Sequence, residues 1–185
     1  MACSTNGNGT GTPPPPPNTT CVFSFGSNST KQLRERVRPG SDEAFLTSAA
    51  TLPGHCRVFA GSSKRWGGSV AAVYPCEGES VNGMVVCMTD AELKILDTYE
   101  GDYERAVAAV NTWGWGKLDV LYYKKTNLAY KQPPSVAYLA AIATMLAEAG
   151  HDTTVTINHV HPGDGSVITT GSWSPQGGLD AVMGG

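Results

Sequence analysis

Two short segments of the sequence contain groups that could do chemistry. The first is Phe25-Gly26-Ser27-Asn28, which follows a β-prone run and precedes a helical pattern. Because glycine lets a ligand approach the backbone and a helix N-terminus presents free N–H groups, this junction predicts a site for an anion or an oxyanion. A single glycine is a weak signal, and a plain strand–helix turn also explains it.

The second segment is an acidic cluster around Glu100, with Asp97, Asp102 and Glu104 close by in the chain. Glu100 follows a predicted helix, and helix C-termini favour cations over carboxylates. We therefore expect the pKa of Glu100 to be raised, as a general base working near neutral pH requires. An exposed acidic cluster without chemistry is the alternative.

Other catalytic patterns fit poorly. The run Gly67-Gly68-Ser69-Val70-Ala71 lacks the final glycine of a serine-hydrolase elbow. His55 and Cys56 are neighbours on a predicted strand, so their side chains should point to opposite faces. His159 and His161 would share a strand face, but no third ligand follows at a recognisable spacing, so we predict no metal site.

The elements that must position these segments are short and of both kinds. A strand is predicted over 21–25, followed by a helix over 30–38 that Ser29 and Gln32 cap and Pro39-Gly40 ends. Charged side chains along this helix are expected to form a solvated face rather than an anion-binding patch. They are Lys31, Arg34, Glu35, Arg36 and Arg38.

The rest of the core alternates strands with helices. Three apolar stretches predict strands of an antiparallel meander, at 57–60, 69–74 and 81–88. A helix capped by Thr89 and Glu92 should end at Gly101, and two more strands are expected at 103–111 and 117–123. A longer helix should begin after Ser135 and end at Gly150. The fold class is therefore α+β.

The length of 185 residues suits one ordinary core. Residues 1–19 are rich in Pro, Gly and Thr and predict a disordered tail, and residues 20–150 hold the apolar patterns of one domain. Residues 151–185 offer a strand at 153–157 and then a Gly-rich polar run with little to bury. We expect a partly loose extension there.

Charge and cysteine usage narrow the partners and the compartment. A net charge of −3 gives no broad cationic surface, which disfavours nucleic acid and anionic membranes as partners. The longest apolar stretch, 136–147, is too short to span a bilayer, and the N-terminus shows no apolar signal region. The five cysteines include no C-x-x-C pair, so reduced thiols and a cytoplasmic location are expected.

The chemical segments lie among further motifs that recur together. Phe25-Gly26-Ser27-Asn28, Gly67-Gly68 with Ala71-Ala72, Leu96-Asp97-Thr98-Tyr99-Glu100-Gly101 and Pro133-Pro134-Ser135-Val136-Ala137-Tyr138 follow in this order. In order and spacing they resemble motifs of the γ-glutamylcyclotransferase family, over about Cys21 to Gly150. Phe25 stands where the family has a tyrosine, and Ser29 where it has a leucine.

The resemblance implies a small twisted mixed or antiparallel β-barrel flanked by helices. It implies cyclisation of a γ-glutamyl amino acid to 5-oxoproline without metal or cofactor, and a possible homodimer. By resemblance Glu100 is the catalytic acid and base, and Tyr138 contacts the small-molecule γ-glutamyl substrate. The remaining substrate-binding residues are then Val22, Phe23, Ser24, Phe25, Gly26, Ser27 and Asn28.

Three alternatives to the cyclisation of γ-glutamyl amino acids stay open. A related enzyme could prefer γ-glutamylamines such as γ-glutamyl-lysine. The chain could instead be a binding module without activity on the same fold, although Glu100 argues against it. Glutathione-specific degradation ranks last, because that branch carries a Gly-Ser-Leu type of loop where this chain has Asn28.

Overall fold

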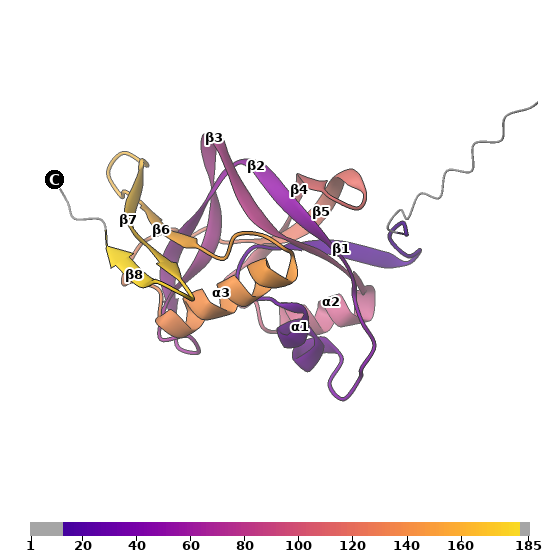
Figure 1. Ribbon diagram of the computed structural model, residues 1–185. Coiled ribbons are helices and arrows are strands. Elements are labelled where there is room, and N and C mark those ends of the chain that lie inside the picture. The colour runs from indigo at the N-terminus through magenta and orange to yellow at the C-terminus, as the bar shows by residue number, and fades with distance from the viewer. Residues whose placement is uncertain (1–12, 182–185) are drawn as a thin grey trace, which may run out of the picture.

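A closed five-stranded barrel forms the centre of the computed structural model, which describes residues 13–181 (Figure 1). Its strands run in the order β1, β3, β2, β4, β5, and β1 closes the barrel by lying parallel to β5 at Val22 and Leu121. The bounds are β1 (Thr19–Ser24), β2 (Leu46–Ser63), β3 (Gly68–Thr89), β4 (Glu104–Thr112) and β5 (Gly116–Lys124). The predicted α+β barrel is confirmed, whereas most of the predicted tail, 1–19, lies outside the described residues.

The strands β2 and β3 form one long hairpin where the sequence predicts three short strands. The stretch 57–60 lies in β2, and both 69–74 and 81–88 lie in β3. Residues 77–80 resemble a turn in the sequence, but they form an exposed part of β3. This strand pairs with β2 on either side of the segment, and the pairing shifts register between Pro53 and His55 of β2. The long hairpin provides two of the five strands of the barrel, and its turn lies beside the site described below.

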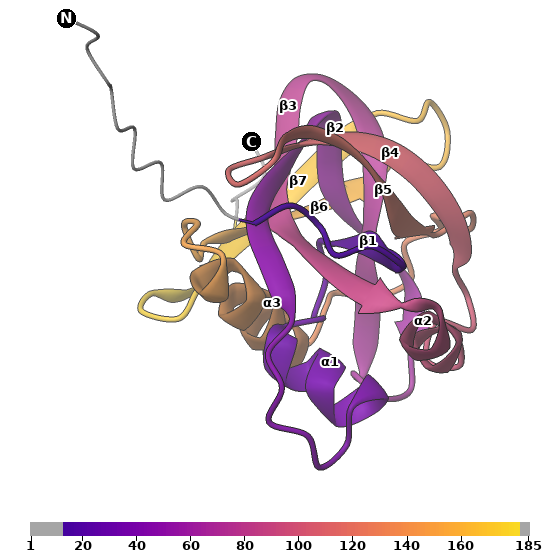
Figure 2. The same cartoon turned by 90° about the vertical axis from the view of Figure 1, so that its right-hand side faces the viewer.

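Three helices lie against the barrel, and side chains cap each of them as the sequence predicts. They are α1 (Thr30–Val37), α2 (Asp90–Asp97) and α3 (Val136–Glu148). The hydroxyls of Ser29, Thr89 and Ser135 accept from the backbone N–H three residues on, satisfying a donor that the helix leaves free. Figure 2 shows α1 and α2 at one end of the barrel. Among residues 13–181, no helix has both the length and the apolar character needed to cross a bilayer.

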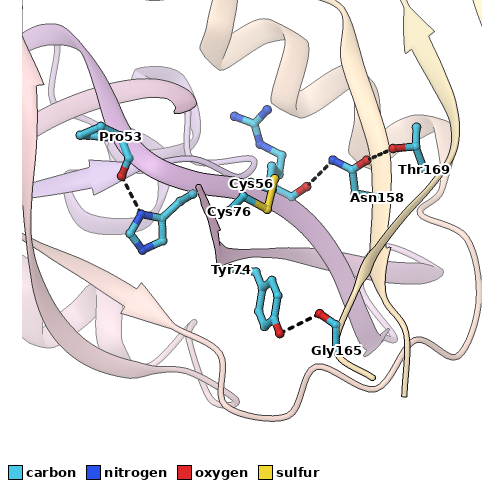
Figure 3. Close-up of a disulfide and its surroundings, with 9 residues drawn as sticks. Pro53, Cys56, Tyr74, Cys76, Asn158, Gly165 and Thr169 are labelled. Carbon is cyan, nitrogen blue, oxygen red and sulfur yellow. Dashed lines mark hydrogen bonds between the residues drawn. A yellow bond between two sulfur atoms is a disulfide. The ribbon is translucent and has the colours of Figure 1, made fainter. Parts of the chain in front are cut away.

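The C-terminal segment is an ordered three-stranded sheet: β6 (Val155–Val160), β7 (Val167–Ser174) and β8 (Gly178–Ala181). The expectation that little would be buried beyond residue 157 is wrong, because Trp173 joins Val155 and Ile157 in the hydrophobic core. Polar contacts fix this sheet to the barrel: Tyr74 donates to the Gly165 carbonyl at 2.9 Å and Asn158 to the Arg57 carbonyl at 3.0 Å (Figure 3). The division of the chain at residues 19 and 150 stays a prediction.

Four of the cysteines form two disulfides, Cys21–Cys87 and Cys56–Cys76, so the prediction of reduced thiols is wrong (Figure 3). Cys21 lies directly opposite Cys87 in the ladder of β1 and β3. Cys56 faces Tyr74 in the hairpin, which places Cys76 one diagonal step away. The register of the strands brings the cysteines of both disulfides together. The spacing of the cysteines along the chain does not reveal this pairing. Disulfides are typical of oxidising compartments, and the cytoplasmic location stays a prediction.

Candidate active site

A cavity of about 450 Å³ lies at the end of β1, where four separate segments meet. It is bounded by the loop 25–28, the β2–β3 turn at 62–66, the segment 99–103 after α2, and Tyr138 of α3. The fold thus joins the two segments that the sequence marks for chemistry, although Asn28 and Glu100 are 72 residues apart. Its volume suits a ligand of small-molecule size.

Glu100 reaches this cavity because α2 ends in a tightened turn. The N–H groups of Thr98, Tyr99 and Glu100 each donate to the carbonyl three residues earlier. This tightening is common at helix C-termini and turns the chain sharply. The Glu100 side chain is only 13% exposed and lines the cavity.

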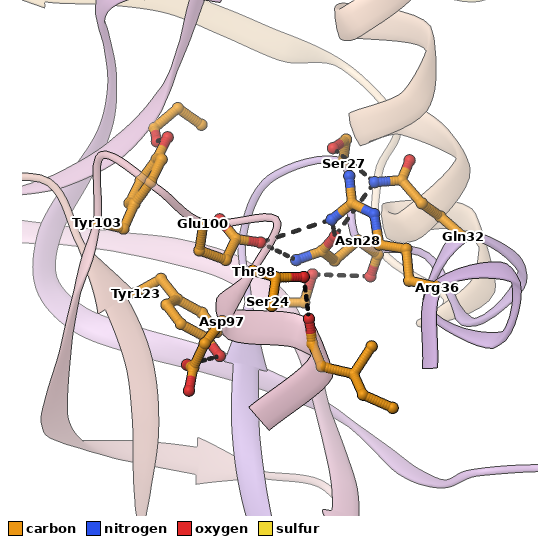
Figure 4. Close-up of polar contacts among 12 residues, drawn as sticks. Ser24, Ser27, Asn28, Gln32, Arg36, Asp97, Thr98, Glu100, Tyr103 and Tyr123 are labelled. Carbon is orange, nitrogen blue, oxygen red and sulfur yellow. Dashed lines mark hydrogen bonds and ion pairs between the residues drawn. The ribbon is translucent and has the colours of Figure 1, made fainter. Parts of the chain in front are cut away.

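Two side chains contact the Glu100 carboxylate, and both contact the same oxygen (Figure 4). Asn28 donates from Nδ2 to Oε1 at 3.1 Å, and Arg36 places Nη1 at 3.5 Å from the same oxygen. Within residues 13–181 no hydrogen bond reaches Oε2. Glu100 is therefore held from one side and has an acceptor left for a ligand.

Burial raises the pKa of the Glu100 carboxyl above its usual range. The hydrogen bond from Asn28 and the charge of Arg36 oppose this shift, and the nearby Asp97 adds to it. The predicted raised pKa is confirmed, but desolvation is its main cause rather than the acidic cluster. Asp97 itself is bonded at both oxygens by Arg105, at 2.9 and 2.7 Å.

The loop before α1 offers backbone donors. The N–H groups of Gly26, Ser27 and Asn28 donate no hydrogen bond within the described part of the chain. By contrast, the first N–H of α1, at Thr30, donates to Glu148 at 2.8 Å. The loop therefore has N–H groups available for an anion, whereas the first N–H of the helix is already used.

Two tyrosines are fixed beside this loop by the backbone of Ala71. Tyr138 accepts from the Ala71 N–H at 2.9 Å, and Tyr103 donates to the Ala71 carbonyl at 2.8 Å. Burial raises the pKa of Tyr138 to about 12, so its hydroxyl stays protonated and can donate to a ligand. A Cβ at Gly26 would lie 3.1 Å from the Tyr138 hydroxyl, so any larger residue there would press on this tyrosine.

The structure separates the predicted substrate-binding residues into two groups. Val22 does not line the cavity, because it is a buried wall residue paired with Val86 and Leu121. The others all line the cavity: Phe23, Ser24, Phe25, Gly26, Ser27, Asn28 and Tyr138. Their roles toward a substrate stay predictions. Tyr103 also lines the cavity but was missed, because its position reads only as the start of a strand.

Sequence reasoning also missed Arg36. The prediction of a solvated helix face is wrong for Arg36 and Arg38, whose side chains are 8% and 14% exposed. Arg36 lines the cavity, and Arg38 binds Glu92 at the start of α2. Leu33, three residues earlier, is buried on the same side of α1, but the sequence alone does not show what covers Arg36 there.

The β2–β3 turn brings a cationic edge to the cavity. Lys64 and Arg65 are exposed and line the cavity mouth. Within the described ranges neither forms an ion pair with a carboxylate. Next to them, the Trp66 ring packs 5.1 Å from the ring of Tyr138. The mouth can therefore attract a second anionic group.

The residues of the rejected chemistries lie elsewhere. Cys56 is in a disulfide, and His55 bonds the Pro53 carbonyl at 2.8 Å. His159 stacks on Tyr130 with ring centroids 4.2 Å apart, and His161 lies 3.2 Å from Asp164. None of these side chains lines the cavity with Glu100.

Comparison with known proteins identifies the class to which this barrel and cavity belong. Residues 22–140 match the family described as Gamma-glutamyl cyclotransferase, AIG2-like. The chain belongs to this family. No curated protein matches the sequence.

Two solved structures are similar to the chain at comparable levels. One, named Gamma-glutamyl cyclotransferase, is 27% identical with a TM-score of 0.63, covering 71% of this chain and 80% of its own. The other, an uncharacterized human protein, is 28% identical with a TM-score of 0.62, covering 72% of this chain and 81% of its own. YkqA from Bacillus subtilis shares the fold at 19% identity, with a TM-score of 0.60, and the match covers 71% of this chain and 49% of YkqA.

Proposed function

We propose that this protein is a γ-glutamylcyclotransferase that converts γ-glutamyl amino acids into 5-oxoproline and a free amino acid. One observation carries the proposal: a buried Glu100 faces a small cavity with one oxygen unbonded and its pKa raised. A carboxylate in this state can take a proton from an amine near neutral pH. Membership of the family supports the same reaction.

In the proposed reaction the α-ammonium group of the substrate lies beside Glu100, which takes one proton. The freed amine attacks the γ-carbonyl carbon of the same molecule and closes a five-membered ring. The bond from that carbon to the leaving nitrogen then breaks as Glu100 returns its proton to this nitrogen. The ring nitrogen gives up its second proton, which the freed amine takes, so the products are 5-oxoproline and the ammonium form of the amino acid. The amine and the carbonyl belong to one molecule, so the protein mainly holds the folded substrate and moves the proton.

The loop and the tyrosines suit the two remaining tasks. The N–H groups of Gly26, Ser27 and Asn28 would bind the α-carboxylate of the γ-glutamyl part or the oxyanion that forms on the γ-carbonyl. The Tyr138 hydroxyl, anchored by Ala71, would donate to the same part of the substrate. Phe25 also lines the cavity, but it has no hydroxyl group and cannot donate a hydrogen bond to the substrate. The backbone N–H groups and Tyr138 would therefore supply the donors.

The charge at the cavity mouth favours an amino acid as the leaving group. A γ-glutamyl amino acid carries a second carboxylate, which the exposed cations Lys64 and Arg65 that line the cavity would attract. In a γ-glutamylamine such as the ε-linked γ-glutamyl-lysine, the carboxylate of the leaving group lies several bonds farther from the amide and beside an ammonium group, so it gains less from these cations. We therefore place γ-glutamyl dipeptides first and γ-glutamylamines second.

The test is 5-oxoproline release by the full chain from γ-glutamyl-alanine, γ-glutamyl-lysine linked through the ε-amine, and glutathione. We expect the fastest release from γ-glutamyl-alanine, with alanine formed in equal amount. An Arg65→Gln variant should raise KM for the dipeptide more than KM for the ε-linked compound. Binding of all three compounds without any release would refute the enzyme and favour the binding module.

A further inference from the structure

Arg36 is a buried cation of the cavity to which the reaction above gives no task. It projects from α1, its side chain is 8% exposed, and its guanidinium lies 4.9 Å from the ring centre of Tyr99. Burying a guanidinium is costly unless its donors are used, and Nε has no partner among the described residues. Stability alone therefore does not account for its position.

The contacts of Arg36 determine how Asn28 is oriented. Nη1 lies 2.7 Å from one atom of the Asn28 amide, and a guanidinium can only donate. That amide atom must therefore be the oxygen, Oδ1, so the amide nitrogen of Asn28 faces Glu100 and donates to it at 3.1 Å. Arg36 thus acts on Glu100 twice, directly and through Asn28 (Figure 4).

Both of these contacts reach the same oxygen of Glu100, Oε1. Resting on the proposed cyclotransferase reaction, we propose that Arg36 is a positioning residue that fixes Oε1 with Asn28 and leaves Oε2 to take the proton of the substrate ammonium group. Without this restraint the carboxylate can rotate, and either oxygen can turn toward the remaining donors. A misplacement of about 1 Å at a reacting group can lower turnover by about 100-fold.

Arg36 also affects the ionisation of Glu100. The charged and titratable groups around Glu100 come from all the surrounding elements: Arg36 of α1, Arg65 of the β2–β3 turn, Asp97 of α2, Asp102 and Tyr103 after it, Tyr123 of β5 and Tyr138 of α3. Of the two arginines among them, Arg36 lowers the pKa of Glu100 more. Its loss should therefore raise that pKa, so the base is ionised only at higher pH.

The test compares Arg36→Gln, Arg36→Lys and Lys31→Gln in the full chain. Lys31 lies on the same helix and is exposed, so its variant removes an equal charge away from the cavity. We expect Arg36→Gln to lower kcat for γ-glutamyl-alanine by about 10- to 100-fold with KM little changed, and to move the acid limb of the kcat/KM profile to higher pH. Arg36→Lys should restore the acid limb of the profile but only part of kcat, because the lysine side chain is shorter and its ammonium group cannot lie where the Arg36 Nη1 makes both contacts.

Three results would overturn the proposal. One is a rise in KM with kcat and the acid limb unchanged, which would make Arg36 a substrate-binding residue. Another is a loss of thermal stability with normal kcat per folded molecule, which would make it structural. The third is a shift of the limb in Lys31→Gln as large as in Arg36→Gln, which would reduce the effect to net charge.

A readout that needs no turnover separates this proposal from the proposed function. The Glu100 carboxyl can be titrated by ¹³C NMR in the wild type and in each variant, with Glu100→Gln used to assign the signal. If the wild type releases no 5-oxoproline, the proposed function fails whatever Arg36 does. If the wild type is active but Arg36→Gln leaves both the Glu100 titration and kcat unchanged, only the positioning role fails.

Discussion

The two ends of α2 each meet an arginine, one within α1 and one that caps the C-terminus of α1, but in different ways. At the start of α2, Arg38 contacts both oxygens of Glu92, with Nε on Oε1 and Nη2 on Oε2. After its end, Arg36 approaches only Oε1 of Glu100, at 3.5 Å. The arginines are two residues apart, and both carboxylates are shielded from water, with exposed fractions of 14% and 13%.

The difference shows how a carboxylate is kept structural or made available for chemistry. At Glu92, burial alone would raise the pKa, but the hydrogen bonds from Arg38 and Thr89 outweigh it and the pKa is lowered. Glu100 lies deeper in the protein than Glu92, so burial outweighs its weaker contacts and the pKa is raised. Saturating both oxygens stabilises the ionised form, whereas leaving one free keeps a proton acceptor.

Short of replacing Glu100 itself, the largest effect should come from disturbing the Glu100 end through Asn28. Asn28→Asp keeps the shape of the side chain but replaces the donor to Oε1 with a second carboxylate. Repulsion should turn Glu100 and draw Arg36 away, lowering kcat/KM for γ-glutamyl-alanine by about 100-fold near pH 7. Steady-state kinetics measure this, and Asn111→Asp on the exposed side of β4 is the matched control. Equal activity of both variants would show that the contact is unimportant.

Disturbing the other end should change stability instead. Glu92→Gln removes the charge that Arg38 binds and weakens the cap at Thr89. We expect the free energy of unfolding to fall by about 1 to 2 kcal/mol in urea titrations. Turnover should stay within about threefold of the wild type, since Glu92 does not line the cavity. A loss of turnover as large as that of Asn28→Asp would remove the distinction between the two ends.

The pH dependence of stability should have opposite signs at the two carboxylates. Glu92, with a lowered pKa, contributes stability above its unfolded pKa, which is lost as the pH falls through its folded pKa. Glu100, with a raised pKa, contributes stability only at low pH, and this is lost as the pH rises through its folded pKa. Unfolding curves of Glu92→Gln should therefore differ from the wild type most at pH 7. Relative to the wild type, Glu100→Gln should be more stable at pH 7 than at pH 4.

The smallest effect is expected at Asp97, a third carboxylate of the same segment. Its pair with Arg105 is 40% exposed on both sides, so Asp97→Asn should cost no more than about 1 kcal/mol of stability. Because Asp97 raises the pKa of Glu100, its neutralisation should move the acid limb of kcat/KM slightly to lower pH. A shift to higher pH would contradict the charge arrangement described for Glu100.

Features contained in short segments could be predicted from the sequence. The caps at Ser29, Thr89 and Ser135 each join residues three positions apart, and the structure has all three. The loop 25–28 and Glu100 were found by type and motif, and the fold brings them to one cavity.

Features that depend on pairing between distant segments could not be predicted. The disulfides join residues 66 and 20 positions apart and follow from strand register. Trp173 is buried only because β7 packs with the rest of the core. Arg36 reads as a surface charge until α1 is placed against the end of α2. The roles of the cavity residues, the substrate and a homodimer stay predictions.

The most direct test of the central claim is an assay of 5-oxoproline release from γ-glutamyl-alanine by Glu100→Gln and Glu92→Gln, prepared in parallel. Both substitutions remove one carboxylate at one end of α2 and keep the side-chain shape. The account predicts that Glu100→Gln stays folded and loses about 1,000-fold or more in kcat, while Glu92→Gln retains its turnover. Normal kcat in folded Glu100→Gln would contradict the assignment of Glu100 as the catalytic base.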